Sequence, residues 1–165
     1  MMPTSVLSGL QAGTLLIAIG PGGAGKSTFA AKAAECGMAV VCLDTLRQEV
    51  SGDAGDQAAT PAAVERQNVL LASHLSAGTS IYLDSTNVEP HVRAALVKRA
   101  RAHGRPIVAL RFLPTLDTCR ARNAARPANR RVPDDVLAWQ HALTHEATVQ
   151  ALVAEGFSAA HDATG

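Results

Sequence analysis

The stretch Gly20-Pro21-Gly22-Gly23-Ala24-Gly25-Lys26-Ser27 decides the fold of this 165-residue chain. It fits the pattern G-x-x-x-x-G-K-[ST], and it stands between the aliphatic run Thr14–Ile19 and a helical pattern that starts at Lys26. A glycine-rich turn between a strand and a helix points successive backbone N–H groups into one concavity, at the positive end of the helix dipole. The stretch therefore predicts a phosphate-binding loop, or P-loop.

Each part of this loop has an expected task in holding ATP and Mg²⁺. Glycines let the phosphates approach the backbone closely. Lys26 is expected to reach the β- and γ-phosphates, and the hydroxyl of Ser27 to join the coordination of Mg²⁺. The residues expected to bind the nucleotide here are Gly22, Gly23, Ala24, Gly25, Lys26, Ser27 and Thr28.

Outside the loop, short aliphatic runs alternate with longer helical patterns. Strands are expected at Thr14–Ile19, Ala39–Leu43, Ser80–Leu83 and Pro106–Phe112, with a weaker one at Phe157–His161. Helices are expected at about Lys26–Cys36, Thr60–Ala77, Pro90–His103, Leu116–Arg126 and Asp134–Glu155. Such alternation is typical of βαβ units. We therefore predict an α/β fold of the P-loop kinase type, with a mostly parallel sheet of about four to five strands flanked by helices, in a single domain over residues 1–165.

Charge and cysteine usage set broad limits. Of the 15 Lys and Arg residues, 11 lie between Arg93 and Arg131, where Asp117 is the only acid. This block could face a polyanion or a nucleotide triphosphate, although a solvated helix face is an alternative for its first part. The three cysteines form neither a disulfide framework nor a zinc pattern. With no basic leader and no long apolar run, we expect a cytoplasmic protein without a membrane contact.

An acidic residue, Asp44, and a basic residue, Arg47, follow the second predicted strand. Asp44 is expected at the carboxyl edge of the sheet, where open α/β sheets bind ligands. Arg47 lies one helical turn further along, on the same face if a helix begins there. A carboxylate at this place can accept the proton of an attacking hydroxyl, and the guanidinium can hold an anionic substrate. The alternative is a helix cap, Asp44, with a surface ion pair.

A second acid ends the next aliphatic run. Asp84 follows Ile81-Tyr82-Leu83, which is the Walker B arrangement of a carboxylate that orients Mg²⁺ or its waters. Short apolar runs that end in Asp are common, so this signal is modest by itself.

Arginines concentrate in the region 116–133, which we predict to be a helical lid. Arg122 and Arg126 are spaced i, i+4 on the predicted helix, with Arg120 nearby. Phosphoryl transfer needs positive charge around the migrating group, and arginines on a closing lid supply it. A solubilising helix face is the alternative.

With these residues in place, the sequence resembles the polynucleotide 5′-kinase family, above all the kinase domain of bacterial polynucleotide kinase-phosphatases. The resemblance runs over nearly the whole chain. It rests on the P-loop with Ser27-Thr28-Phe29, on Asp44-x-x-Arg47, on Asp56–Thr60, on Asp84-Ser85-Thr86-Asn87-Val88 and on Cys119–Arg126.

The resemblance implies a role for several residues. Asp44 would be the general base on a 5′-hydroxyl of RNA or DNA, and Arg47 would grip the neighbouring phosphate. Arg122 and Arg126 would contact the ATP phosphates. Asp84 and Asn87 would shape the site beside the metal, and Gln57 and Thr60 would line the acceptor pocket. Related repair enzymes carry phosphatase and ligase modules, which could here act in trans.

Other functions remain open at this stage. The sequence shows none of the base-reading patterns of GTPases, and it is too short for most ring ATPases. A kinase of a small molecule, such as a sugar acid, a nucleoside or an antibiotic, would share the loop, the size and the lid. A nucleotide-dependent binding or switch module, and a toxin that phosphorylates a cell-wall precursor, are further alternatives.

Overall fold

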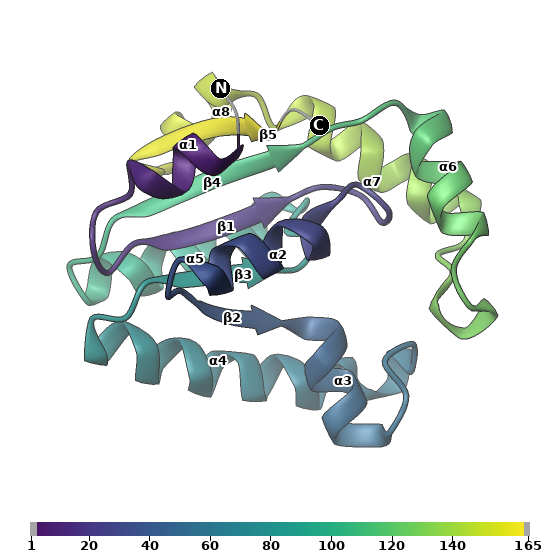
Figure 1. The fold of residues 1–165 in the computed structure, drawn as a ribbon, viewed down its shortest axis with the longest axis horizontal. Coiled ribbons are helices and arrows are strands. Elements are labelled where there is room, and N and C mark those ends of the chain that lie inside the picture. Colours follow the sequence, from purple (N-terminus) through teal and green to yellow (C-terminus); the bar gives the residue numbers. More distant parts are fainter. Residues whose placement is uncertain (1–2, 164–165) are drawn as a thin grey trace.

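The computed structural model describes residues 3–163, and its centre is a five-stranded parallel sheet (Figure 1). The strand order is β2-β3-β1-β4-β5, and all four strand pairs are parallel. The strands are β1 (Leu15–Ile19), β2 (Ala39–Cys42), β3 (Ile81–Asp84), β4 (Ile107–Phe112) and β5 (Ala159–Ala163). The predicted α/β class with a parallel sheet is therefore confirmed.

Helices connect the strands and cover both faces of the sheet. They are α1 (Pro3–Ser8), α2 (Lys26–Glu35), α3 (Leu43–Ser51), α4 (Thr60–Ala77), α5 (Pro90–Ala102), α6 (Leu116–Ala124), α7 (Asp134–Glu146) and α8 (Val149–Glu155). Two short 3₁₀ turns lie at η1 (Gln57–Ala59) and η2 (Ala128–Arg130). Within residues 3–163, no helix combines the length and apolarity needed to cross a bilayer.

The alternation of side chains along β1 divides the apolar core in two. Leu15, Ile17 and Ile19 pack on one face, with residues of α3, α4, α5 and α8. Leu16 and Ala18 pack on the other, with residues of α1, α2, α6 and α7. Because β1 is buried on both faces, it reads as a continuous aliphatic run.

Three predicted elements differ from the structure by more than one residue at an end. The helix expected over Asp134–Glu155 is two helices, because Thr148 leaves the helical conformation and its hydroxyl caps α8 by accepting from the Ala151 N–H. The last strand begins at Ala159, because the N–H of Phe157 donates to the Leu152 carbonyl of α8 and the Phe157 side chain is buried in the core. The helix of the lid region ends at Ala124, before Arg126.

The basic block between Arg93 and Arg131 is not one surface. α5 leaves the carboxyl edge of the sheet after β3 and ends just before β4 begins, so its last arginines lie at the amino edge. The arginines of 120–131 follow β4 and lie at the carboxyl edge. Arg93 is buried, and its guanidinium makes an ion pair of 2.8 Å with Glu155. Only the second part of the block can serve a site at the carboxyl edge.

Candidate active site

A cavity of about 1070 Å³ lies at the carboxyl edge of the sheet. Its walls are the P-loop, the start of α3, the loop at 54–57, the turn after β3 and the region 116–133. Its charged lining consists of seven basic and two acidic side chains: Lys26, Lys32, Arg47, Arg122, Arg126, Arg130, Arg131, Asp44 and Asp84. This excess of positive charge suits anionic ligands.

The P-loop joins β1 to α2 and bends tightly at its glycines. Gly25 precedes α2 with a φ of 104°, a conformation that side-chain-bearing residues rarely adopt. A Cβ at Gly23 would lie 3.1 Å from the Cys119 carbonyl oxygen, so glycine also lets α6 pack against the loop. The hydroxyl of Tyr82 donates to the Lys26 carbonyl at 2.8 Å and fixes the first turn of α2 to β3.

Lys26 turns back onto its own loop. Its Nζ donates to the carbonyl oxygens of Gly20 (2.9 Å) and Pro21 (2.6 Å). Burial lowers the pKa of Lys26 to about 8, although Asp84 opposes this shift. The amino group of Lys26 is therefore buried beside the P-loop.

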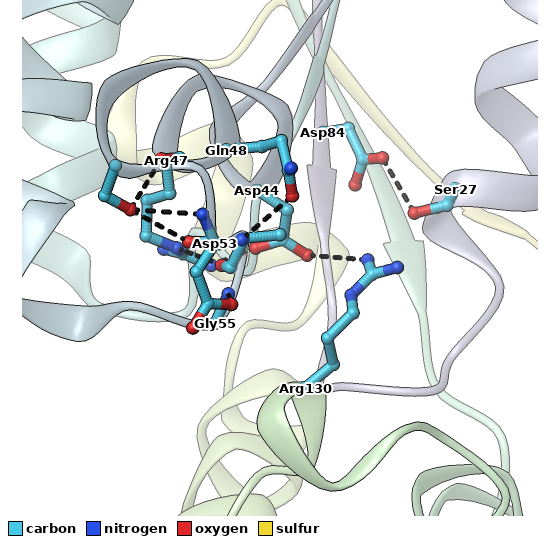
Figure 2. Close-up of polar contacts among 10 residues, drawn as sticks. Ser27, Asp44, Arg47, Gln48, Asp53, Gly55, Asp84 and Arg130 are labelled. Carbon is cyan, nitrogen blue, oxygen red and sulfur yellow. Dashed lines mark hydrogen bonds and ion pairs between the residues drawn. The ribbon is translucent and has the colours of Figure 1, made fainter.

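Ser27 and Asp84 form the pair expected for Mg²⁺. Ser27 Oγ donates to Asp84 Oδ2 at 3.0 Å, and Figure 2 shows the two side chains facing each other. A hydroxyl and a carboxylate are oxygen donors of the kind that Mg²⁺ selects, so the residues fit the ion. Because residues 3–163 hold no cluster of three or more His, Cys, Asp or Glu side chains, phosphate and water would have to complete the coordination.

Asp44 lies between two arginines (Figure 2). α3 starts at Leu43, so Asp44 and Arg47 share one face, and Arg47 Nη2 donates to Asp44 Oδ1. Arg47 Nε also donates to the Ala54 carbonyl at 2.8 Å. On the other side, Arg130 Nη2 is 3.5 Å from Asp44 Oδ2. The predicted pair of Asp44 and Arg47 is therefore formed, and it lines the same cavity as Lys26.

The region 116–133 brings two of its three expected arginines to the cavity. Arg122 Nη1 donates to the Gly23 carbonyl at 3.0 Å, and Arg126 Nη1 approaches Gly22 from the turn beyond α6. Arg120 pairs with Asp134 at 2.8 Å and is absent from the cavity lining. Arg122 and Arg126 thus come from a helix and from the turn after it, rather than from one helical face, and Arg130 and Arg131 line the cavity beside them.

Of the three remaining residues predicted to lie near the acceptor or the metal, one lines the cavity and two do not. Gln57 lines the cavity, whereas Thr60 and Asn87 do not. Asn87 is buried with a φ of 48°, and its amide donates to the Ala18 carbonyl at 2.8 Å, which suits a structural role in the turn after β3. In the same turn, Ser85 Oγ is buried without a hydrogen-bond partner among the described residues, and Ser85 lines the cavity.

Sequence reasoning missed two contacts to the cavity walls. Gln140 of α7 accepts a hydrogen bond from the Gly22 N–H at 3.1 Å, which ties this helix to the P-loop. Asn129 donates from Nδ2 to Asp53 at 2.8 Å and joins η2 to the loop after α3. The partners are 118 and 76 residues apart, so no local pattern could indicate either contact.

Several solved structures share this fold. A gluconokinase from Sinorhizobium meliloti 1021 is 17% identical, with a TM-score of 0.57 over 93% of this chain and 83% of the other. A shikimate kinase from Acinetobacter baumannii is 17% identical, with a TM-score of 0.58 over 99% and 88%. The complex AvrRxo1-ORF1:-ORF2 with ATP gives 16% identity and a TM-score of 0.67 over 93% of this chain and 54% of the matched chain. At these identities the likeness concerns the fold alone.

Sequence comparison gives a family. No curated protein matches the chain. Residues 15–147, however, match the family model AAA_33, described as "AAA domain", and this span runs from β1 through the P-loop and the arginine-rich region to the end of α7. Because the match covers most of the chain, the chain belongs to this AAA domain family of P-loop proteins.

Proposed function

We propose that the chain is a kinase that transfers the γ-phosphoryl group of ATP to a hydroxyl, with the 5′-hydroxyl end of RNA or DNA as the first candidate acceptor. One observation carries the proposal: the carboxylate of Asp44, held by Arg47, lines the same cavity as the P-loop lysine. A base and an anion-binding group thus accompany the phosphate cradle, as hydroxyl phosphorylation requires.

Each group has one task in this reaction. Lys26, Arg122 and Arg126 bind the ATP phosphates and offset the charge on the migrating phosphoryl group. Asp44 accepts the hydroxyl proton, and Arg47 binds a phosphate of the acceptor. Ser27 and Asp84 would hold Mg²⁺, which supplies charge neutralisation and orients the phosphates.

Two cavity residues near Asp44 suit the end of a nucleic acid as the acceptor. Arg47 lies one turn from Asp44, at the spacing that resembles polynucleotide 5′-kinases, and Gln57 lies on the same side of the cavity. We further propose that residues 1–165 work as one domain, with 116–133 as its lid. Phosphatase and ligase partners of a repair reaction would then act in trans.

A second candidate is a kinase of a small anionic hydroxyl compound. The contacts of Asn129 with Asp53 and of Arg130 with Asp44 join η2 to α3 and to the loop after it. They narrow the space next to Asp44, which favours a compact substrate. The gluconokinase and shikimate kinase folds support the same candidate, because both names refer to small hydroxy acids.

A transfer assay separates the two candidates. The protein, Mg²⁺ and γ-labelled ATP are mixed with 5′-hydroxyl RNA, with 5′-hydroxyl DNA, and separately with gluconate, shikimate and nucleosides. Label on an oligonucleotide, lost with a 5′-phosphate end and with Asp44→Ala, supports the first candidate. Label only on a small molecule supports the second. ATP binding without transfer to any acceptor contradicts both and favours a nucleotide-binding module.

A further inference from the structure

The two oxygens of the Asp44 carboxylate have different partners. Oδ1 accepts from Arg47, whose Nε is also fixed to the Ala54 carbonyl and whose side chain is only 12% exposed. Oδ2 faces Arg130, whose side chain is 45% exposed and whose nearest nitrogen is 3.5 Å away. The first pair is anchored, whereas the second is at the limit of a hydrogen bond and open to solvent, where ion pairs are weak.

Oδ2 is therefore the Asp44 oxygen that is less firmly paired and easier for a hydroxyl to reach. The approach of such a hydroxyl displaces the guanidinium of Arg130 from this oxygen. The backbone that carries Arg130 is held beside the cavity, because its neighbour Asn129 is bonded to Asp53, and Gly55 packs so closely on Asn129 that a Cβ there would overlap the Asn129 carbonyl. Arg130 itself lines the cavity. A guanidinium released from Oδ2 therefore remains within reach of an acceptor in the same cavity.

We propose that Arg130 is a specificity-determining residue, which exchanges Asp44 for an anionic group of the acceptor next to the hydroxyl that is phosphorylated. This inference rests on the proposed function. A guanidinium presents a planar fork that matches a phosphate or a carboxylate. With Arg47 on the other side of Asp44, it forms a pair of cationic groups around the base, as Figure 2 shows. The acceptor class is thus a hydroxyl compound with a phosphate or carboxylate close to the reacting hydroxyl.

Matched acceptors that differ in one charge test this assignment. Cytidine 3′-monophosphate and cytidine form the nucleotide pair, and gluconate and sorbitol form the sugar pair. Binding of each to the protein with saturating ADP and Mg²⁺ is measured by calorimetry, and transfer from ATP is measured separately. The variants are Arg130→Gln and, as a matched control, Arg120→Gln, because Arg120 is a similarly exposed arginine of the same region that pairs with Asp134 and does not line the cavity.

The wild type and Arg120→Gln are expected to bind the charged member of one pair at least about tenfold more tightly than the neutral member. Arg130→Gln should reduce this ratio to about threefold or less, with little change for the neutral compound. The pair that shows the effect identifies a nucleotide phosphate or a sugar carboxylate as the source.

The inference is overturned if Arg130→Gln weakens both members equally or keeps the ratio, or if the wild type prefers neither charged compound. A charge-dependent ratio without any phosphoryl transfer would leave the assignment of Arg130 in place and reject the proposed reaction.

Discussion

Replacing Lys26 by Met should change how the stability of the ligand-free protein depends on pH. In the folded protein, burial lowers the pKa of Lys26 to about 8 from its usual value of 10.5. The unfolded chain therefore binds this proton more tightly than the folded one. Below pH 8 the lysine is charged in both states, and folding must desolvate its charge. As the pH rises from 8 to 10.5, the folded state is neutral here while the unfolded state loses its proton, so the destabilisation disappears.

The structure gives the size of the effect. A shift from 10.5 to about 8 corresponds to roughly 3 kcal/mol, at about 1.4 kcal/mol for each pKa unit. Met also removes the hydrogen bonds to the carbonyls of Gly20 and Pro21, but this loss changes little with pH. The comparison between two pH values cancels it. Relative to Lys26→Met, the wild type should gain about 3 kcal/mol between pH 7 and pH 10.5.

Urea unfolding of both proteins, without nucleotide, measures this difference at several pH values. Lys32→Met removes an exposed lysine of the same helix and controls for the loss of a positive charge. A difference between wild type and Lys26→Met that stays constant from pH 7 to 10.5 would refute the reasoning. It would show that water reaches Lys26 in the ligand-free protein.

Three further substitutions have defined outcomes. Asp44→Asn should lower kcat by about 10²- to 10⁴-fold with an unchanged affinity for ATP, because it removes the base and leaves the nucleotide cradle intact; transfer rates and a fluorescent-ATP titration measure this. Asp84→Asn should raise the Mg²⁺ concentration for half-maximal activity by about tenfold or more, as a Mg²⁺ titration would show. Arg93→Ala should lower the free energy of unfolding by about 3–5 kcal/mol in urea, because it leaves Glu155 without its buried partner.

Two of these substitutions have a control variant, and each of the three has an outcome that would contradict it. Asp56→Asn alters a half-buried loop acid that is absent from the cavity lining, and a kcat loss equal to that of Asp44→Asn would deny Asp44 a special role. An unshifted Mg²⁺ titration would remove Asp84 from the metal site. Lys98→Ala, on an exposed position of α5, should cost little; an equally small cost at Arg93 would mean that its ion pair contributes nothing.

The sequence predicted the sheet because parallel strands buried on both faces are largely apolar, as the whole of β1 and the first three residues of β3 are. It predicted α4 to the residue, since Pro61 near its start and Gly78 after its end are strong boundary signals. The break between α7 and α8 carries no such signal. Alanine and threonine, the residue types at 147 and 148, are both common inside helices of other proteins. Only the hydroxyl cap of Thr148 shows where the second helix begins.

The P-loop side of the site and its lining arginines Arg122 and Arg126 were accessible to sequence reasoning, whereas the contact of Arg130 with Asp44 was not. Lys26, Ser27 and Asp84 each follow a strand or open a helix, so local pattern places them at one edge of the sheet. Arg130 meets Asp44 across 86 residues of sequence. Its position depends on how the region after α6 folds back over α3, which no periodicity or spacing encodes.

The bond between Gln140 and the P-loop has an optical consequence. The chain has a single tryptophan, Trp139, directly before Gln140 on α7, and its side chain is 46% exposed. Ligands that reorganise the amide of Gly22 must also perturb the helix that carries the indole. The emission of this one fluorophore therefore offers a label-free signal of nucleotide occupancy, uncontaminated by other tryptophans and available for stopped-flow measurements.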